Sequence, residues 1–309
     1  MKNIYSIIKK AKKNLENKDV VAIPTETVYG LAGNAYSDKA VKKIYKIKKR
    51  PFKNPLIVHY HNLHDFNKDC ISNKSFQILY KKFCPGPLTF VVFLKKKSKI
   101  SKLTNANKKT IAVRFPKNKI ARQLLSKINF PLAAPSANTS TKVSPVCAND
   151  VKDDLGKKVR LIINGGKSKI GLESTIIDLS GKIRILRPGS ITIKDLEKVL
   201  KIKINFKNKF KEFKSPGQSK LHYSPGIPIR LNAKFPKKNE AFIKLSNKKK
   251  IKNYFALSKN GNLKEAAKNL FSILRLIKKK GYKSIAISKI PNRGIGLAIN
   301  DRLKKASNK

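Results

Sequence analysis

Apolar residues fall into short runs along the first 200 positions, and these runs predict strands. A run of about four to eight apolar residues rich in β-branched side chains is typical of a buried strand. Such runs occupy residues 20–23, 56–60, 88–94, 111–115, 132–134 and 159–163. Residues 174–179 and 182–186 flank Ser180-Gly181, a pair that favours a two-residue hairpin turn.

Apolar residues at helical spacing predict helices between these strands. The spacing occurs at residues 4–15, 41–45, 76–83 and 120–128. Ser37 is a suitable N-cap for the second of these helices. Thr192 with Asp195 forms a capping box that opens a further helix, which runs to residue 200. Strands and helices in this mixed order predict a layered α/β domain.

A change of character after residue 203 predicts a second domain. Residues 204–226 lack a clear period and contain SPGQSKLHYSPGIP, whose prolines and glycines are typical of a linker. Beyond it the same patterns predict strands at 227–231, 241–245, 254–257 and 284–288, and helices at 262–279 and 295–305. The predicted organisation is therefore a larger domain at 1–203, a linker at 204–226 and a smaller α/β domain at 227–309.

Composition adds a strong positive charge to this picture. The formal net charge is +55, and no apolar run reaches the length of about 18 residues that a membrane span needs. Cationic side chains suit an RNA partner, but only 10 of the 72 basic residues are Arg, the residue best suited to grip phosphate. Compositional bias is therefore the favoured explanation, and weak RNA binding is the compatible alternative. Three widely spaced cysteines without a CxxC pair favour a reducing cytoplasm.

Two familiar ligand motifs fail on inspection. Gly166-Lys167-Ser168 lacks the glycine that a phosphate-binding P-loop requires five positions earlier, where Leu161 stands. His59, His61 and His64 lie close together, but ordinary hydrogen bonding is favoured over a zinc site for them. Neither motif therefore defines a binding site.

Polar residues follow several predicted strands directly. Thr25-Glu26-Thr27 follows the first strand and Ser136-Ala137-Asn138 follows another. Thr110 and Arg114 share a face of one strand, because side chains alternate along it. Polar residues at strand ends are expected to meet in the site of an open α/β sheet.

The motifs together resemble a known family. PTETVYGL, KKRP with NPLIVH, PGPLT, TIAVRFP, APSAN, ESTIIDLS and LRPG occur in the order of the YrdC domain. HYSP and PNRGIGLAINDR resemble the long Sua5 form of the Sua5/YrdC/YciO family. This resemblance implies a twisted mixed sheet with helices around a large open cleft, plus a smaller C-terminal α/β Sua5 domain.

The resemblance also implies an activity. The family makes L-threonylcarbamoyladenylate from L-threonine, bicarbonate or CO2, and ATP, with release of pyrophosphate. Downstream tRNA threonylcarbamoyl-transferase proteins then use this product to modify position 37 of ANN-decoding tRNAs. Mg2+ is expected to accompany ATP without dedicated protein ligands. The linker at 204–226 is expected to act as a lid.

Site residues follow from matching positions in the family's motifs. The resemblance assigns L-threonine binding to Thr27, His59, Arg114 and Ser174. It assigns ATP binding to Arg50, Asn54, Thr110, Ala134, Ser136, Ser144, Arg187 and Tyr223. It assigns the catalytic signature to Lys48, Arg50, Ser136 and Asn138.

Two other function classes compete with this interpretation. An RNA-binding module without chemistry would account for the charge but not for Thr27, His59, Arg114 and Ser174 occurring together. A carbamoyltransferase of the hydrogenase-maturation type contains a related domain. That family also carries an acylphosphatase-like region and Cys-rich zinc fingers, and three scattered cysteines do not match them.

Overall fold

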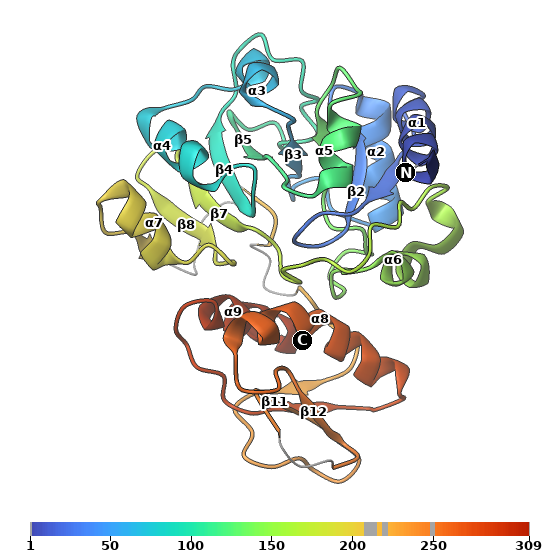
Figure 1. Ribbon diagram of the computed structural model, residues 1–309, viewed down its shortest axis with the longest axis vertical. Helices are drawn as coiled ribbons and strands as arrows, with labels where there is room; N and C mark the ends of the chain where they lie inside the picture. Colours follow the sequence, from blue (N-terminus) through green and yellow to red (C-terminus); the bar gives the residue numbers. More distant parts are fainter. Residues whose placement is uncertain (1, 207–214, 218–221, 248–250, 309) are drawn as a thin grey trace.

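Two β-sheets of very different size organise the chain, as the computed structural model shows for residues 2–206, 215–217, 222–247 and 251–308. The larger sheet and its helices form the upper part of the molecule in Figure 1. The smaller sheet lies below it, and helices α8 (Leu263–Lys279) and α9 (Gly296–Ser307) lie between the small sheet and the larger part. This arrangement confirms the predicted α/β fold class.

The larger sheet is mixed and has the order β1-β2-β6-β3-β5-β4-β7-β8-β9. Its pairs β3–β5, β4–β7 and β8–β9 are parallel, and its other pairs are antiparallel. The strands are β1 (Val21–Ile23), β2 (Gly30–Asn34), β3 (Ile57–His59), β4 (Leu88–Phe93), β5 (Thr110–Arg114), β6 (Leu132–Ala133), β7 (Thr175–Asp178), β8 (Arg184–Arg187) and β9 (Asn205–Phe206).

Helices surround this sheet, and their sequences explain where several of them begin. Ser37 caps α2 by accepting the amide of Ala40, and Thr192 with Asp195 forms the predicted capping box of α7. The helices are α1 (Lys2–Glu16), α2 (Asp38–Lys48), α3 (Leu63–Asp69), α4 (Lys74–Phe83), α5 (Lys119–Leu125), α6 (Ala148–Leu155), the 3₁₀ turn η1 (Gly156–Lys158) and α7 (Ile193–Leu200). None of the helices described here is long and apolar enough to cross a membrane.

Alternation along β5 decides which residues reach the open side of the sheet. Ile111 and Val113 belong to the main apolar core, whereas Ala112 belongs to a small separate cluster on the opposite face. Because side chains alternate along a strand, Thr110 and Arg114 share the face of Ala112, as the sequence predicts. The scarce Arg on this strand therefore points away from the main core.

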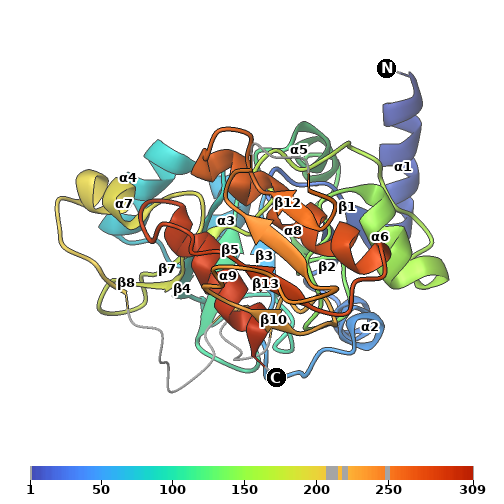
Figure 2. The same ribbon diagram turned by 90° about the horizontal axis from the view of Figure 1, so that it is seen from below.

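The smaller sheet has the order β10-β13-β11-β12, with parallel pairing throughout. Its strands are β10 (Ile229–Arg230), β11 (Ala241–Lys244), β12 (Tyr254–Ala256) and β13 (Ile285–Ile287). Seen from below in Figure 2, α8 and α9 lie behind these strands, on the side of the larger part. The apolar core of the smaller part also includes Val28, Val143, Val146 and Leu172 of the larger part. Apolar packing therefore joins the two parts.

Some local predictions were wrong. Residues 159–163 do not form a strand: only an isolated bridge links Ile162 to Ala22, and the chain leaves the sheet at the following Asn-Gly-Gly. The hairpin of β7 and β8 exists, but its loop spans residues 179–183 instead of two residues. Asp178 stabilises this loop by accepting the amide and hydroxyl of Ser180. The predicted helix at 120–128 ends at Leu125.

Other elements were not predicted. Strand β2 begins at the end of the motif PTETVYGL that follows β1, and its two glycines lower the apparent strand propensity. Gly33 packs closely there, because a Cβ would lie 3.2 Å from Cδ1 of Ile44. Helices α3 and α6 were also missed. Strand β9 falls within the predicted linker, while residues 207–214 and 218–221 of that linker lie outside the described residues.

Candidate functional site

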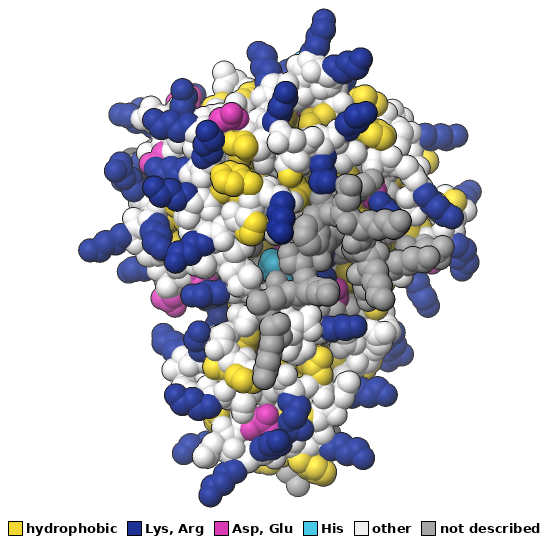
Figure 3. Space-filling view, turned by 180° about the vertical axis from the view of Figure 1, so that it is seen from behind, with side chains coloured by type: hydrophobic (Ala, Val, Ile, Leu, Met, Phe, Trp, Pro, Cys, Tyr) yellow, Lys and Arg dark blue, Asp and Glu magenta, His cyan; other side chains and the backbone are white. Residues whose placement is uncertain are grey.

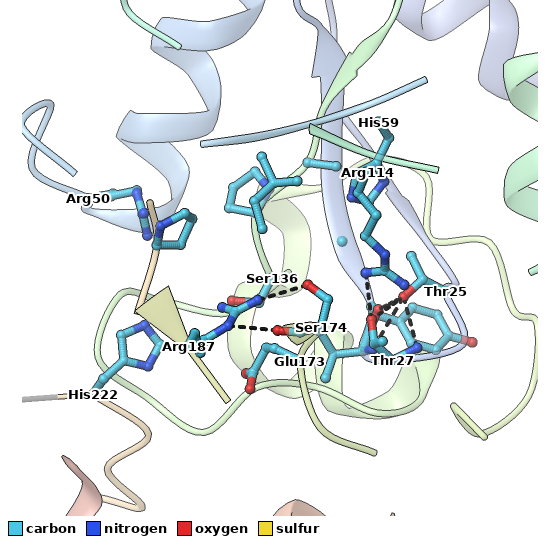
Figure 4. A pocket seen from close by; sticks show the side chains of 17 residues that line it. Thr25, Thr27, Arg50, His59, Arg114, Ser136, Glu173, Ser174, Arg187 and His222 are labelled. Carbon is cyan, nitrogen blue, oxygen red and sulfur yellow. Dashed lines mark hydrogen bonds between the residues drawn. The ribbon is translucent and has the colours of Figure 1, made fainter. Parts of the chain in front are cut away.

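A polar pocket opens on the side of the larger sheet that Arg114 faces (Figure 4). It encloses about 500 Å³, counting space open to solvent, and strand ends, loops and the linker supply its walls. Eight residues predicted for the site line it: Thr27, Arg50, His59, Arg114, Ala134, Ser136, Ser174 and Arg187. The structure therefore brings together residues that are up to 160 positions apart in the sequence.

Lys48 lies behind the pocket wall and supports it. Its Nζ donates hydrogen bonds to the carbonyl oxygens of Ser136 and Asn138, at 2.5 and 2.6 Å. Burial, followed by the nearby Arg50 charge, holds the pKa of Lys48 well below its usual value. In this arrangement the predicted catalytic lysine fixes the loop that carries Ser136.

Asn54, Asn138 and Ser144 are likewise buried beside the pocket without lining it. The backbone oxygen and side chain of Asn54 accept hydrogen bonds from Arg50. The Nδ2 of Asn138 donates to Thr139 and Lys142, both at 2.9 Å, and the hydroxyl of Ser144 donates to Glu173. These three residues therefore hold the loops that carry pocket residues.

Thr110 and Tyr223 complete the predicted residues that do not line the pocket. Thr110 is buried at the start of β5, at the opposite end of the strand from Arg114. Tyr223 is fully buried and stacks on Phe271 of α8. Of the predicted linker, His222 and Pro216 line the pocket instead.

Arg114 is the cationic side chain on one side of the pocket. Its Nη2 forms an ion pair with Glu26 at 2.7 Å, and its Nη1 donates to the hydroxyl of Thr27 at 2.7 Å. Its Nε donates to the carbonyl of Gly86 at 3.3 Å. Thr25 orders the same loop, since its hydroxyl donates to the carbonyl of Val28 at 2.6 Å. The side chain is thus fixed in place before any ligand binds.

A second cationic group lies on the other side of the pocket, and Ser174 lies between the two groups. In Figure 4, Arg50, Arg187 and His222 lie to the left, and Arg114 lies to the right. Arg187 donates from Nε to the carbonyl and from Nη2 to the hydroxyl of Ser174, both at 3.0 Å. The hydroxyl of Ser174 also lies 2.7 Å from that of Thr89.

Positive charge in this second group is only partly compensated, since Glu173, an acidic neighbour of Arg187, already pairs with Arg302. Burial lowers the pKa of Arg50 to about 10, and the neighbouring Arg187 charge adds to the effect. Burial also lowers the pKa of Arg187. Buried charge of one sign is costly unless an opposite charge arrives. The group is therefore suited to bind an anion with several negative oxygens.

Comparison with known proteins identifies the family. The Sua5/YciO/YrdC family model, described as telomere recombination, matches residues 13–189. The model of the threonylcarbamoyl-AMP synthase C-terminal domain matches residues 191–308. The chain belongs to the Sua5/YrdC family.

Individual relatives agree over nearly the whole chain. The threonylcarbamoyl-AMP synthase of Pyrococcus abyssi is 36% identical over 93% of this chain and 90% of its own length. That of Bacillus subtilis is 34% identical over 95% of this chain and 90% of its own length. The crystal structure of P. abyssi Sua5 complexed with L-threonine superposes with a TM-score of 0.90 at 33% identity, covering 97% of this chain and 94% of that one. These relatives confirm the prediction of an enzyme of the nucleotidyltransferase type, in the long Sua5 form.

HypF shares only the fold. Full-length HypF in its phosphate- and nucleotide-bound form matches 58% of this chain with a TM-score of 0.52 at 22% identity, and this chain covers 28% of it. A likeness at this level is an argument about fold alone.

The residues assigned to the site of this Sua5/YrdC chain did not include two acidic side chains and one arginine, although Glu26 is among the polar residues that follow the first strand. Glu26 pairs with Arg114, and Glu173 lines the pocket. Arg302, in the C-terminal part, pairs with Glu173 at 3.1 Å. One signal was available: the chain has only 17 acidic residues, and Glu26 and Glu173 stand inside the motifs PTETVYGL and ESTIIDLS.

Two buried histidines make stability depend on pH. Burial, with nearby Arg114, holds the pKa of His59 well below its usual value, and burial with nearby Arg50 does the same for His222. Below pH about 6.5 the unfolded chain binds protons at these positions and the folded protein does not. The stability that these two histidines contribute is therefore fully present above that pH. It is lost as the pH drops toward their pKa values in the folded protein.

For each of these histidines, we expect the free energy of unfolding to fall by up to about 1.4 kcal/mol for each pH unit below about 6.5. Urea denaturation at pH 7.5, 6.5 and 5.5 measures the effect. His59→Gln and His222→Gln should each make the curve of unfolding free energy against pH shallower. Curves parallel to that of the wild type would contradict the assignment.

Proposed function

We propose that this protein catalyses the ATP-dependent synthesis of L-threonylcarbamoyladenylate from L-threonine, bicarbonate or CO2, and ATP, with release of pyrophosphate. The observation that carries the proposal is the pairing of two anion-binding groups in one pocket. Arg114 with Thr27 suits a carboxylate, and Arg50 with Arg187 suits phosphates. Ser174 contacts Arg187 and lies between the two groups. The L-threonine complex of P. abyssi Sua5 supports the same proposal.

The reaction needs positioning and charge stabilisation more than a reactive side chain. The threonine amine attacks CO2 and loses a proton, giving a carbamate. A carbamate oxygen then attacks the α-phosphorus of ATP, the bond to the bridging oxygen breaks, and pyrophosphate leaves. Negative charge builds on the phosphoryl oxygens and the leaving group, so fixed cations such as Arg50 and Arg187 lower the barrier. Arg114 holds the amino acid by its carboxylate.

The pocket's own side chains do not fit a metal ion. Glu173 accepts a hydrogen bond from Ser144 on one carboxylate oxygen and pairs with Arg302 through the other. Over the described part of the chain, His, Cys, Asp and Glu form no group of three that could hold a metal. In this proposal Mg2+ enters with ATP, and no step depends on a protein ligand for it.

The described linker residues 215–217 and 222–226 are proposed to act as a lid, because a carbamate and a mixed anhydride both decay in water. His222 and Pro216 line the pocket, and Tyr223 anchors the segment against Phe271, with ring centroids 5.6 Å apart. Tyr223→Ala is expected to raise the KM for ATP about tenfold by loosening this cover. Kinetics at saturating L-threonine measures the change, with Tyr282→Ala in the smaller domain as control. Unchanged ATP affinity and turnover would refute the lid.

In the cell, the product is proposed to supply tRNA threonylcarbamoyl-transferases that modify position 37 of ANN-decoding tRNAs. A cytoplasmic location suits this role and the three free thiols. Weak RNA binding stays an alternative use of the positive surface. On the face drawn in Figure 3, outside its grey atoms, Lys and Arg are spread over both parts and are not gathered into one stripe. This spread favours a generally basic surface over a defined RNA track.

One experiment tests the proposed activity directly. Purified protein is incubated with L-threonine, bicarbonate, ATP and Mg2+, and mass spectrometry follows threonylcarbamoyl-AMP and pyrophosphate. Omitting L-threonine, bicarbonate or ATP in turn should abolish the product. Pyrophosphate release independent of L-threonine would point to another reaction, and RNA retention without any product would favour a binding module.

A further inference from the structure

Arg302 reaches from the C-terminal part into the wall of the pocket. It belongs to α9 and its side chain is 0% exposed. Its Nε pairs with Glu173 at 3.1 Å, its Nη1 donates to the carbonyl of Pro188 at 2.6 Å, and its guanidinium lies 5.4 Å from the ring centre of Tyr223. One side chain thus contacts three separate segments of the chain.

Each of these partners adjoins a residue assigned to the nucleotide. Glu173 accepts the hydroxyl of Ser144, Pro188 directly follows Arg187, and Tyr223 is itself one of the assigned residues. A planar guanidinium can bond in several fixed directions at once, which a lysine cannot. The geometry of Arg302 therefore sets the relative positions of all three segments.

We propose that Arg302 is a positioning residue for ATP, supplied to the pocket by the C-terminal part. This inference rests on the proposed function and extends it. The pocket proper is built from the larger part and the linker, yet its nucleotide side is held by α9. Helix α9 also holds the linker directly, since the amide of His222 donates to the carbonyl of Lys305 at 3.2 Å. The C-terminal part is then a component of the active site.

The competing explanation is that Arg302 only joins the two parts. A second ion pair between them provides the comparison. Arg275 of α8 pairs with Asp154 of α6 at 2.5 Å, and neither residue lines the pocket. Asp154→Asn breaks that pair and keeps the hydrogen bond from Arg275 to the carbonyl of Val143. It is therefore a matched control for losing a charge contact between the parts.

The test compares Arg302→Lys with Asp154→Asn. Arg302→Lys keeps the positive charge beside Glu173 but cannot keep all the other contacts. We expect it to raise the KM for ATP about tenfold while the KM for L-threonine changes less than about twofold. Asp154→Asn should change neither KM. Arg302→Met, which removes the charge, should have a larger effect on the same constant.

Hydrogen exchange without any ligand gives a second readout. Arg302→Lys should speed amide exchange at residues 172–175 and 187–190, and Asp154→Asn should not. An equal rise in both KM values, or unchanged exchange at these residues, would overturn the inference and leave Arg302 as a simple link. If the wild-type protein makes no product, the proposed function fails, and the exchange experiment alone then decides whether Arg302 positions this wall.

Discussion

Arg50→Ala is expected to lower the rate of threonylcarbamoyl-AMP formation about 10³-fold. Arg50 lines the pocket, is buried, and lies with Arg187 in the cationic group that suits the phosphates. Removing a fixed positive charge from such a site leaves developing phosphoryl charge uncompensated. The KM for L-threonine should change little, because the proposed amino-acid site at Arg114 lies on the other side of the pocket. Product formation under saturating substrates measures the effect.

Two controls separate chemistry from folding in this experiment. Arg50 also donates to the backbone oxygens of Asn54 at 2.9 Å and Pro55 at 2.8 Å, so its loss loosens that loop. Arg50→Lys keeps the charge and should recover part of the rate. Arg184→Ala removes an arginine of β8 whose side chain is 45% exposed, and should leave activity intact. A folded Arg50→Ala protein with wild-type activity would rule out this role.

Strong periodicity is what made much of the fold predictable. Strands β4 and β5 and helix α8 match their predictions to within one or two residues, because each carries a clear apolar period. Strand β2 was missed because Gly30 and Gly33 replace the side chains that would mark the period. Residues 159–163 have the right composition, but the pairing that they make with β1 is one residue long. Pairing depends on a partner, which local sequence does not encode.

The site was predictable where its residues end strands. His59, Arg114 and Arg187 each end a strand and line the pocket, as the strand-end argument expects. Contacts between distant segments were not predictable in this way. Arg302 and Glu173 are 129 positions apart, and no local pattern connects them. The bonds from Lys48 to the backbone carbonyls of Ser136 and Asn138 join α2 to the loop after β6, and no local pattern predicts them.

Charge illustrates a different limit of sequence reasoning. The net charge of +55 suggests a nucleic-acid partner, yet the functional evidence lies in a few buried arginines. Exposed lysines are well solvated and contribute little that is specific. The burial of Arg50, Arg114, Arg187 and Arg302 distinguishes them from the basic surface. Scarcity in the sequence, with only 10 arginines, was a usable signal for Arg50 and Arg114, whereas Arg302 was not predicted.

Arg114→Lys is expected to raise the KM for L-threonine about 10²-fold while the KM for ATP stays nearly constant. A guanidinium has five N–H donors; in Arg114, Nε donates one to Gly86 and Nη1 donates one to Thr27, while Nη2 lies 2.7 Å from Glu26 as an ion pair. Nη2 makes no hydrogen bond within the described structure, so both terminal nitrogens keep an N–H group, and two such nitrogens can hold a carboxylate in two places. A lysine offers only a point charge and cannot reproduce it.

Calorimetric titration of L-threonine, together with steady-state kinetics, measures this change. Arg122→Lys is the matched control, because Arg122 lies on α5 outside the pocket and donates to the carbonyl of His61 at 3.2 Å. The decisive quantity is the change in the KM for L-threonine divided by the change in the KM for ATP. If the ion pair between Arg114 and Glu26 were purely structural, Arg114→Lys would weaken the binding of both substrates to a similar extent. A loss of affinity confined to L-threonine would assign Arg114 to the amino-acid carboxylate. An equal loss of affinity for ATP would exclude that assignment.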